Sequence, residues 1–302
     1  MNSDLFELMS EIADIEQDVP LSAMTTLRIG GPARYVAYPD STVALDALIR
    51  LLSDNDIPYK VIGKGSNLLC SDDPYDGVII RLDKFDDYYF IGTDLIAQAG
   101  CSIIALSYQA MKNGLSGLEF ASGIPASVGG VTYMNAGAYR SSMSDVIDSV
   151  FVYRDRRFEW IPVEECGFSY RRSIFQEHHD WIVVAAKIRL EKKDIKEIRE
   201  LMDSRRERRM ASQPLDKPSA GSVFRNPDSV PAWKLIEGIG YRGKKCGGAM
   251  VSDKHVNFIV NEDGASAADF LELVNEIKEQ VEKQYQIRLH MEVERFNWPS
   301  GK

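Results

Sequence analysis

The sequence predicts an α+β protein with at least two domains. Amphipathic helices and short apolar strands are mixed along the chain, without the strict β-α-β alternation of a doubly wound sheet. The chain has 302 residues, which is long enough for two or three separate cores. A Pro/Ser-rich connector, ASQPLDKPSAGS at 211–222, is typical of a boundary between domains.

Helices are predicted where apolar residues recur on one helical face. Ser41 or Thr42 is the candidate N-cap of the second helix, and Ser266 and Asp269 form a capping box before the last one. Gly114 closes the third helix at its C-terminal end. The predicted helices are 3–12, 41–56, 101–114, 192–210, 231–240 and 266–285.

Strands are predicted where β-branched and aromatic residues run together or alternate with polar ones. The first predicted strand runs directly into a glycine-containing loop. In the last one, alternation places Glu292 and Glu294 on the face opposite the apolar residues. The predicted strands are 59–63, 77–82, 146–155, 181–190 and 287–296.

Charge and composition exclude two classes of protein. The net charge of −9 argues against a protein that coats nucleic acid, because phosphate binding depends on clustered Lys and Arg. No apolar run approaches the roughly 18 residues of a membrane span. The N-terminus, MNSDLFELMSEI, has acidic residues where a signal peptide has a basic segment. We therefore expect a cytoplasmic protein with no nucleic-acid partner and no membrane insertion.

Metal binding is not expected. The four cysteines are widely spaced and form no C-x-x-C pair, so they indicate neither a zinc site nor a disulfide scaffold. They are Cys70, Cys101, Cys166 and Cys246. Of the four histidines only His178 and His179 are adjacent, and neighbours on a chain rarely converge on one metal.

Two short glycine patterns have different meanings. GKGSN at 63–67 follows a predicted strand, and its amides and serine hydroxyl are suited to a nest for phosphate oxygens. Its spacing is not that of a Walker A loop, and it fits a strand-ending turn equally well. The formal G-x-G-x-x-G at 238–243 follows a helix and opens none, so it does not indicate a dinucleotide fold of the Rossmann type.

The segment 114–139, GLSGLEFASGIPASVGGVTYMNAGAY, is rich in glycine and also in apolar residues. A linker would contain more serine and charge, so this composition indicates packed, irregular backbone. Such backbone leaves amides that need partners, and a bound cofactor can supply them. The residue chemistry favours cofactor binding over packing alone.

Three side chains are candidates for chemistry, and each has a structural alternative. Arg171 is suited to gripping a carboxylate through two hydrogen bonds, but an arginine in a surface loop fits as well. Glu292 is of interest only if its face of the last strand lines a cavity. Ser222, in SAGSVFRNP, is either a turn residue or a hydroxyl within reach of a substrate. The arginine cluster at 205–209 is either a solvated helix end or a clamp for a diphosphate.

Seven motifs, taken in order, resemble the UDP-N-acetylenolpyruvoylglucosamine reductase family, also called the UDP-N-acetylmuramate dehydrogenases. They are TTLRIGGPA, GKGSNLL, GLEFASGIPASVGGVTYMNAGAY, YRRSIF, AGSVFRNP, GGAMVSDKHVNFIVN and MEVE. The resemblance extends from Thr25 to Glu294, nearly the whole chain. Seven motifs in one order are far more specific than any one of them.

The resemblance implies an FAD-binding region of the vanillyl-alcohol-oxidase type, with α+β subdomains at about 1–82 and 83–192. A C-terminal α+β substrate domain is expected at 193–302, with the last strand returning towards the active site. The implied reaction is the NADPH-dependent reduction of UDP-N-acetylglucosamine enolpyruvate to UDP-N-acetylmuramate through FAD, in peptidoglycan precursor synthesis. NADPH reduces the flavin and leaves, and flavin N5 then gives hydride to C3 of the enolpyruvyl group.

The resemblance also implies roles for individual residues. Ser222 is expected to protonate C2, while Arg171 and Glu292 polarise the substrate carboxylate. Tyr170 and Asn226 are expected to bind the substrate. The expected FAD contacts are Gly63, Lys64, Gly65, Ser66, Asn67, Leu68, Ser122, Gly123, Ile124, Pro125, Ser127, Val128, Gly129, Gly137 and Arg225.

Some features depart from the family pattern. Glu294 stands where relatives commonly have a basic residue, and Arg140 stands where glycine is frequent. The chain lacks the extra loop that folds a tyrosine over the substrate in the longer form, so it resembles the short form, and we expect a monomer. The alternative is another FAD oxidoreductase of the same fold, which would not need Ser222, Arg171 and Glu292 together.

Overall fold

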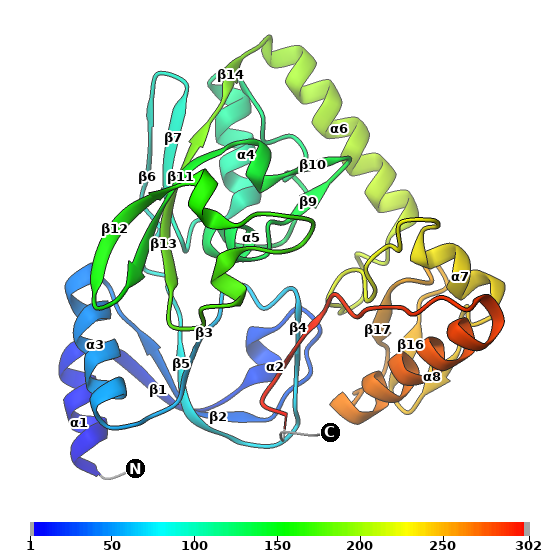
Figure 1. The fold of residues 1–302 in the computed structure, drawn as a ribbon, viewed down its shortest axis with the longest axis horizontal. Helices are drawn as coiled ribbons and strands as arrows, with labels where there is room; N and C mark the ends of the chain where they lie inside the picture. Colours follow the sequence, from blue (N-terminus) through cyan, green and yellow to red (C-terminus); the bar gives the residue numbers. More distant parts are fainter. Residues whose placement is uncertain (1–2, 299–302) are drawn as a thin grey trace. The chain divides into compact units, whose positions relative to one another are not determined.

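The computed structural model describes residues 3–298, and it divides the chain into two compact units (Figure 1). Unit 1 comprises Met1–Gln17, Tyr35–Lys64 and Asp76–Glu207, and unit 2 comprises Asp18–Arg34, Gly65–Tyr75 and Arg208–Lys302. The two units therefore alternate along the chain. The domain boundaries predicted from the sequence instead divide the chain into consecutive blocks.

Unit 1 contains a five-stranded antiparallel sheet in the order β12-β11-β13-β7-β6 (Figure 1). Its strands are β6 (Tyr88–Ile91), β7 (Asp94–Gln98), β11 (Ile147–Arg154), β12 (Arg157–Pro162) and β13 (Ile182–Arg189). Successive side chains of a strand point to opposite faces. On β13, Val183 therefore packs into one buried cluster, while Ile182 and Val184 pack into another.

The first of these clusters contains α4 (Ile103–Lys112) and α5 (Val128–Tyr133), through residues such as Leu106 and Val131. The chain after α4 forms β8 (Leu115–Ser116), which pairs with β14 (Glu191–Lys192). After α5, β9 (Gly137–Ala138) and β10 (Ser141–Ser142) form a short hairpin. Three turns of 3₁₀ helix follow, at Met143–Asp145, Val163–Cys166 and Ile174–Gln176. The glycine-rich segment is thus packed, irregular backbone, as its composition predicts.

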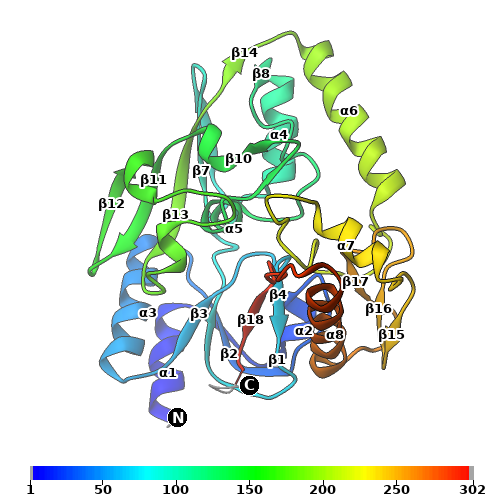
Figure 2. The same ribbon diagram turned by 45° about the vertical axis from the view of Figure 1, so that its right-hand side comes forward.

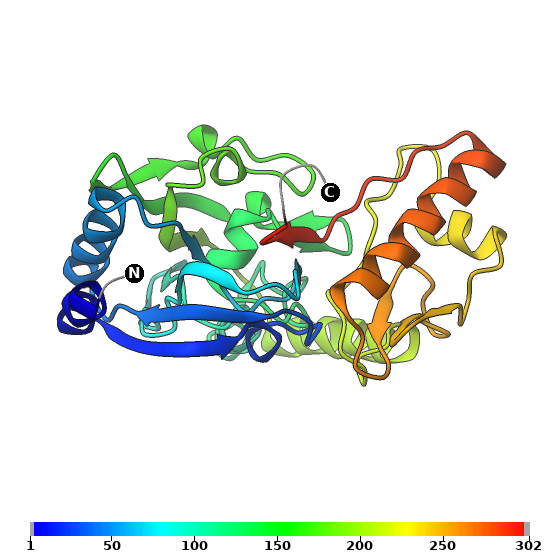
Figure 3. The same cartoon turned by 90° about the horizontal axis from the view of Figure 1, so that it is seen from below.

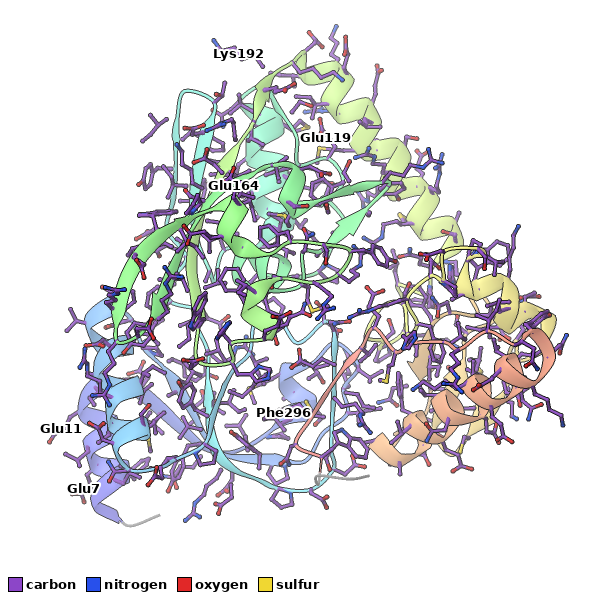
Figure 4. All side chains as sticks on the ribbon, viewed as in Figure 1. Glu7, Glu11, Glu119, Glu164, Lys192 and Phe296 are labelled. Carbon is purple, nitrogen blue, oxygen red and sulfur yellow. The ribbon has the colours of Figure 1, made fainter. Side chains whose placement is uncertain are left out.

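The second cluster lies under α1 (Ser3–Ile12) and α3 (Thr42–Asp54), which Figure 3 shows side by side. Glu7 and Glu11 lie on the outer side of α1 (Figure 4). A four-stranded sheet has the order β1-β2-β5-β3. Its strands are β1 (Asp14–Pro20), β2 (Pro32–Tyr38), β3 (Tyr59–Val61) and β5 (Tyr75–Ile80). The charged helix α6 (Ile195–Ser212) buries Ile198 and Met202 against Met111 of α4.

Unit 2 contains a three-stranded antiparallel sheet, β15-β16-β17, with α8 against it (Figure 2). The elements of unit 2 are α2 (Leu21–Met24), β4 (Leu68–Cys70), α7 (Ala232–Gly238), β15 (Lys245–Cys246), β16 (Ala249–Val251), β17 (Ile259–Asn261), α8 (Ala267–Tyr285) and β18 (Glu294–Phe296). Leu27, Ile29 and Leu69 share one buried cluster with these C-terminal elements. This shared core explains why two early segments of the chain belong to unit 2.

The predicted helix caps are confirmed. Ser41 accepts a hydrogen bond from the Ala44 N–H at 3.2 Å at the start of α3. Ser266 and Asp269 form the reciprocal capping box of α8, with bonds of 3.1 and 2.9 Å. In the part of the chain that the structure describes, no helix is long and apolar enough to cross a membrane.

The prediction of one continuous last strand at 287–296 is wrong, because this segment changes its partner. Its first part bonds to residues 223–225: the Arg225 N–H donates to the His290 carbonyl at 2.9 Å. Its last part, β18, runs parallel to β4. At the start of β18, the Glu294 N–H donates to the Asn67 carbonyl at 2.9 Å. Only Glu294–Phe296 is therefore a regular strand.

Candidate active site

The loop after β3 approaches the start of α5 within unit 1. A Cβ atom added to Gly63 would lie 2.7 Å from the Ser127 hydroxyl oxygen, which no side chain tolerates. Ser127 is the N-cap of α5, and its hydroxyl accepts a hydrogen bond from the Gly130 N–H at 3.4 Å. Two of the predicted FAD contacts, Gly63 and Ser127, are thus neighbours in space.

Gly65, Ser66 and Asn67, the last three residues of the GKGSN motif, lie in unit 2. Gly65 has φ +61°, and a Cβ atom added there would lie 2.2 Å from the Met24 carbonyl oxygen. Asn67 donates from Nδ2 to the Glu292 carbonyl at 3.2 Å. Asn67 therefore supports the main chain of Glu292, one of the predicted catalytic residues.

The glycine-rich segment turns around a buried carboxylate, Glu119, which is 6% exposed and labelled in Figure 4. It accepts hydrogen bonds from the Ser116 hydroxyl at 2.6 Å and the Gly117 N–H at 2.9 Å. The Ser122 hydroxyl donates to the Glu119 carbonyl at 2.9 Å. A buried charge is costly unless it is hydrogen-bonded, so this residue fixes the turn before the predicted FAD contacts at 122–129. Sequence reasoning missed it.

Arg171 lies in a turn with φ +57°, a conformation that is costly for any residue except glycine. Its guanidinium donates to the Gly137 carbonyl at 2.6 Å and lies over the ring of Tyr170, 5.1 Å from the centroid. Ser169 and Arg172 close the turn with two main-chain bonds of 3.1 Å. The structure thus brings together Arg171, Gly137 and Tyr170, three residues that the sequence analysis singled out.

Three polar side chains fasten this turn to the end of α5. Asn135, which is 3% exposed, donates to the Ser169 carbonyl at 2.9 Å. The Ser173 hydroxyl and the Gln176 amide both donate to the Tyr133 carbonyl, at 2.5 and 3.0 Å. Sequence reasoning missed all three as site residues. In the sequence, Asn135 can be noticed as a lone amide side chain within YMNAGA, a run of small and apolar residues.

Ser222 and Glu292 lie on neighbouring segments of unit 2. The Glu292 N–H donates to the Val223 carbonyl at 2.7 Å, and Phe224 and Met291 form an antiparallel bridge. Val223 and Phe224 are each 1% exposed, so the main chain that follows Ser222 is buried. The segment that follows Ser222, the predicted proton donor, therefore pairs with the segment that carries Glu292.

Arg225 and Asn226 continue the same segment. Asn226 accepts a hydrogen bond from the Ala232 N–H at 3.0 Å, which caps the start of α7. Among the described residues, Arg225 Nε is a buried nitrogen that has no hydrogen-bond partner. Buried polar atoms are normally satisfied, and a ligand acceptor at this position would satisfy Arg225 Nε; Arg81 Nε likewise has no hydrogen-bond partner in the described part of the chain.

Each unit by itself offers groups that suit an FAD molecule. In unit 1, Gly63 leaves no room for a side chain beside Ser127, and in unit 2, Gly65 leaves none beside the Met24 carbonyl; bare backbone of this kind lets a phosphate approach closely. Also in unit 2, Arg225 Nε is a buried donor without a partner among the described residues. Lys64 is already engaged by Asp83, at 3.1 Å. Burial would raise the pKa of the Asp83 carboxyl, but hydrogen bonds from Arg81 and Lys64 outweigh burial and lower it.

The arginine cluster of α6 has partners within the protein. The Arg205 guanidinium lies over the ring of Tyr139, 4.9 Å from its centroid, and the Tyr139 hydroxyl donates to the Arg205 carbonyl at 2.9 Å. Arg209 donates to Gln213 at 3.1 Å. These contacts give two of the arginines a structural role.

The cysteines are all free, and three are buried. Burial raises the pKa of Cys101 to about 11 and that of Cys166 to about 12, so both remain thiols at neutral pH. Across residues 3–298, no three His, Cys, Asp or Glu side chains gather into a group that could hold a metal ion.

Comparisons with known proteins agree on one family. Residues 33–155 match a family model described as an FAD binding domain, and residues 213–296 match one described as the UDP-N-acetylenolpyruvoylglucosamine reductase C-terminal domain. The UDP-N-acetylenolpyruvoylglucosamine reductase of Carboxydothermus hydrogenoformans is 45% identical over 291 residues, 95% of this chain and 96% of that protein. The Bacillus subtilis protein of the same name is 40% identical over 286 residues, 94% of both chains.

Solved structures give the same result. The structure of UDP-N-acetylenolpyruvylglucosamine reductase from Thermus caldophilus has a TM-score of 0.81 at 35% identity, covering 95% of this chain and 99% of that one. The glucose dehydrogenase Phl p 4.0202 has a TM-score of 0.50 at 15% identity, covering 63% of this chain and 44% of that one. This second likeness concerns the fold alone.

Proposed function

The chain belongs to the UDP-N-acetylenolpyruvoylglucosamine reductase family, and we propose how its residues carry out the reaction of that family. It is an FAD-dependent oxidoreductase of peptidoglycan precursor synthesis, with an FAD-binding region of the vanillyl-alcohol-oxidase type. Its substrate is UDP-N-acetylglucosamine enolpyruvate, and NADPH is the reductant. When bound, FAD supplies the redox chemistry, taking electrons from NADPH and adding a hydride to C3 of the enolpyruvyl group.

Arg171 grips the substrate carboxylate. Addition at C3 leaves an electron pair at C2, which spreads into the carboxylate as an enolate, and a guanidinium stabilises that growing charge. The hydrogen bond from Arg171 to the Gly137 carbonyl, and the hydrogen-bonded turn around it, hold the guanidinium in place before the substrate arrives. Such preorganisation is what makes electrostatic stabilisation effective.

Glu292 polarises the substrate carboxylate together with Arg171. Its main chain is fixed on both sides, because its N–H donates to Val223 and its carbonyl accepts from Asn67. The Glu292 side chain is thus carried by a rigid segment rather than by a mobile chain end.

Ser222 supplies the proton at C2. The Oγ–H bond of Ser222 breaks as the C2–H bond forms from the enolate electron pair, and the serine alkoxide then regains a proton from water. A neutral serine is a weak acid, so it serves only against a strongly basic carbanion, which is what addition at C3 creates.

The observation that carries the proposal is the 2.7 Å hydrogen bond from the Glu292 N–H to the Val223 carbonyl, which places the residue after Ser222 beside Glu292. An anaerobic titration tests it. NADPH is expected to bleach the flavin of the purified protein, and UDP-N-acetylglucosamine enolpyruvate is expected to restore its colour. Bleaching without recovery would favour the alternative, an FAD oxidoreductase of the same fold with another substrate.

This proposal also includes the predicted FAD contacts, the substrate contacts of Tyr170 and Asn226, the cytoplasmic location and the monomeric state. The side chain of Tyr170 is 53% exposed, which leaves it accessible to a substrate. Light scattering after size-exclusion chromatography measures the oligomeric state directly.

A further inference from the structure

Asn257 is a buried amide that no step of the proposed reaction uses. It is 4% exposed and lies in the loop between β16 and β17. Its side chain binds both main-chain groups of a single residue: the Phe224 N–H donates to Oδ1 at 3.0 Å, and Nδ2 donates to the Phe224 carbonyl at 2.9 Å. The Asn257 carbonyl also accepts from the Val223 N–H, at 2.8 Å.

Asn257 therefore hydrogen-bonds to Val223 and Phe224, the two residues after Ser222, as the main chain of a neighbouring strand would. On their other side, the Val223 carbonyl accepts from the Glu292 N–H. All four main-chain polar groups of Val223 and Phe224 are thus satisfied, three of them by Asn257. Removing this amide would leave two buried main-chain groups of Phe224 without partners, which is costly.

Before Ser222, the main chain is held three residues away: the Ser219 N–H donates to the Thr26 carbonyl at 3.1 Å, and its carbonyl accepts from the Thr26 hydroxyl at 2.7 Å. Between them, Gly221 has φ +77°, and a Cβ atom added there would find no heavy atom within 4 Å. The restraint next to Ser222 is therefore the one on its C-terminal side, where Asn257 fixes the main chain against the segment of Glu292.

We propose that Asn257 is a positioning residue for proton transfer, because it holds the main chain after Ser222 against the segment that carries Glu292. This inference rests on the proposed role of Ser222 as the proton donor. Asn257 itself touches neither substrate nor flavin in this account. A displacement of about 1 Å at a reacting group can cost about 10²-fold in rate, so the loss of Asn257 should slow protonation by that order.

The test measures the two half-reactions separately by anaerobic stopped-flow absorbance. In Asn257→Ala, flavin reduction by NADPH should remain within about twofold, while reoxidation by UDP-N-acetylglucosamine enolpyruvate should slow about 10²-fold. The solvent deuterium isotope effect on reoxidation should also rise, because protonation becomes the slow step. Equal slowing of both half-reactions, or an unchanged isotope effect, would overturn the inference.

A double-mutant comparison separates positioning from general damage. If Asn257 acts through Ser222, then Asn257→Ala should cause little further slowing of reoxidation in a Ser222→Ala background. Slowing of the same size in both backgrounds would overturn the inference. If Ser222→Ala alone leaves reoxidation unchanged, it is the proposed role of Ser222 that fails.

Two further variants complete the design. Asn257→Asp keeps the acceptor for the Phe224 N–H, but it sets an oxygen against the Phe224 carbonyl and adds a buried charge, so it should also slow reoxidation. The matched control is Asn261→Ala, because Asn261 also donates to main-chain carbonyls, those of Leu27 and Arg28 at 3.2 Å. The control should lower stability and leave the isotope effect unchanged. An isotope effect that rises equally in the control would contradict a specific role for Asn257.

Discussion

The guanidinium of Arg171 donates a 2.6 Å hydrogen bond to the carbonyl oxygen of Gly137, which lies just after α5 in the glycine-rich segment. The predicted carboxylate clamp is therefore attached to the segment predicted to contact FAD. Arg171 also holds φ +57°, and such a conformation persists only when its surroundings determine it.

Replacing Arg171 by lysine should weaken reduction of the substrate while sparing the flavin. Lysine keeps the positive charge but loses the fork of donors that matches a carboxylate. We expect kcat/KM for UDP-N-acetylglucosamine enolpyruvate to fall about 10- to 100-fold, the cost of one charge-assisted hydrogen bond. The control is Arg172→Lys, since the neighbouring Arg172 guanidinium pairs with the exposed Glu177, at 3.2 Å. Equal losses of kcat/KM in the two variants would contradict a role for Arg171 in binding the substrate carboxylate.

Substitution of Gly65 should release FAD. The left-handed conformation alone costs an alanine about 1–2 kcal/mol. At Gly65 the added Cβ would also lie 2.2 Å from the Met24 carbonyl, whereas at Gly92, with φ +63°, it would meet nothing within 4 Å. The ratio of flavin to protein absorbance should therefore fall in Gly65→Ala and stay at the wild-type value in Gly92→Ala. Full flavin content in Gly65→Ala would contradict the proposed cradle.

Acidification below about pH 6.5, the usual pKa of histidine, should destabilise the protein through His255. Burial lowers the pKa of His255, and the nearby Arg242 lowers it further. Between the lowered pKa and the ordinary one the unfolded chain binds more protons than the folded chain, so stability falls as the pH falls. Protonation at Nδ1 would also remove the acceptor of the Asn257 N–H, at 3.3 Å.

Urea denaturation at pH 7.5, 6.5 and 5.5 measures this dependence. The fall in the free energy of unfolding between the first and last pH should be smaller in His255→Gln than in the wild type. The exposed His290 provides the control, and His290→Gln should keep the wild-type dependence. If His255→Gln keeps the wild-type pH dependence as well, burial of His255 is not the source of that dependence.

Much of the local structure could be predicted from the sequence because it depends on local chemistry. Helix starts at Ser41 and Ser266 follow from side chains that satisfy nearby amides, and the structure has both. The last strand could not be predicted over its full length. Alternation shows which side chains are buried, but not that the segment exchanges residues 223–225 for Asn67 as its partner.

The supporting residues of the site were harder to predict than the candidates for chemistry. The motif resemblance named Ser222, Arg171 and Glu292. By contrast, Asn257 acts through a main-chain partner that is fixed by the fold, because Phe224 is 33 residues away in the sequence. A single sequence shows an amide within the apolar run HVNFIV, but not the backbone that it binds.

The most direct measurement is single-turnover, anaerobic stopped-flow of Ser222→Ala beside its control, Ser219→Ala. Ser219 lies in the same loop, and its main chain is bonded to Thr26. If Ser222 is the proton donor, NADPH should bleach the flavin at the wild-type rate in both variants. Reoxidation by UDP-N-acetylglucosamine enolpyruvate should slow about 10²- to 10⁴-fold in Ser222→Ala alone, the range for loss of a general acid. Reoxidation at the wild-type rate in Ser222→Ala, or an equal loss in both half-reactions, would contradict this role of Ser222.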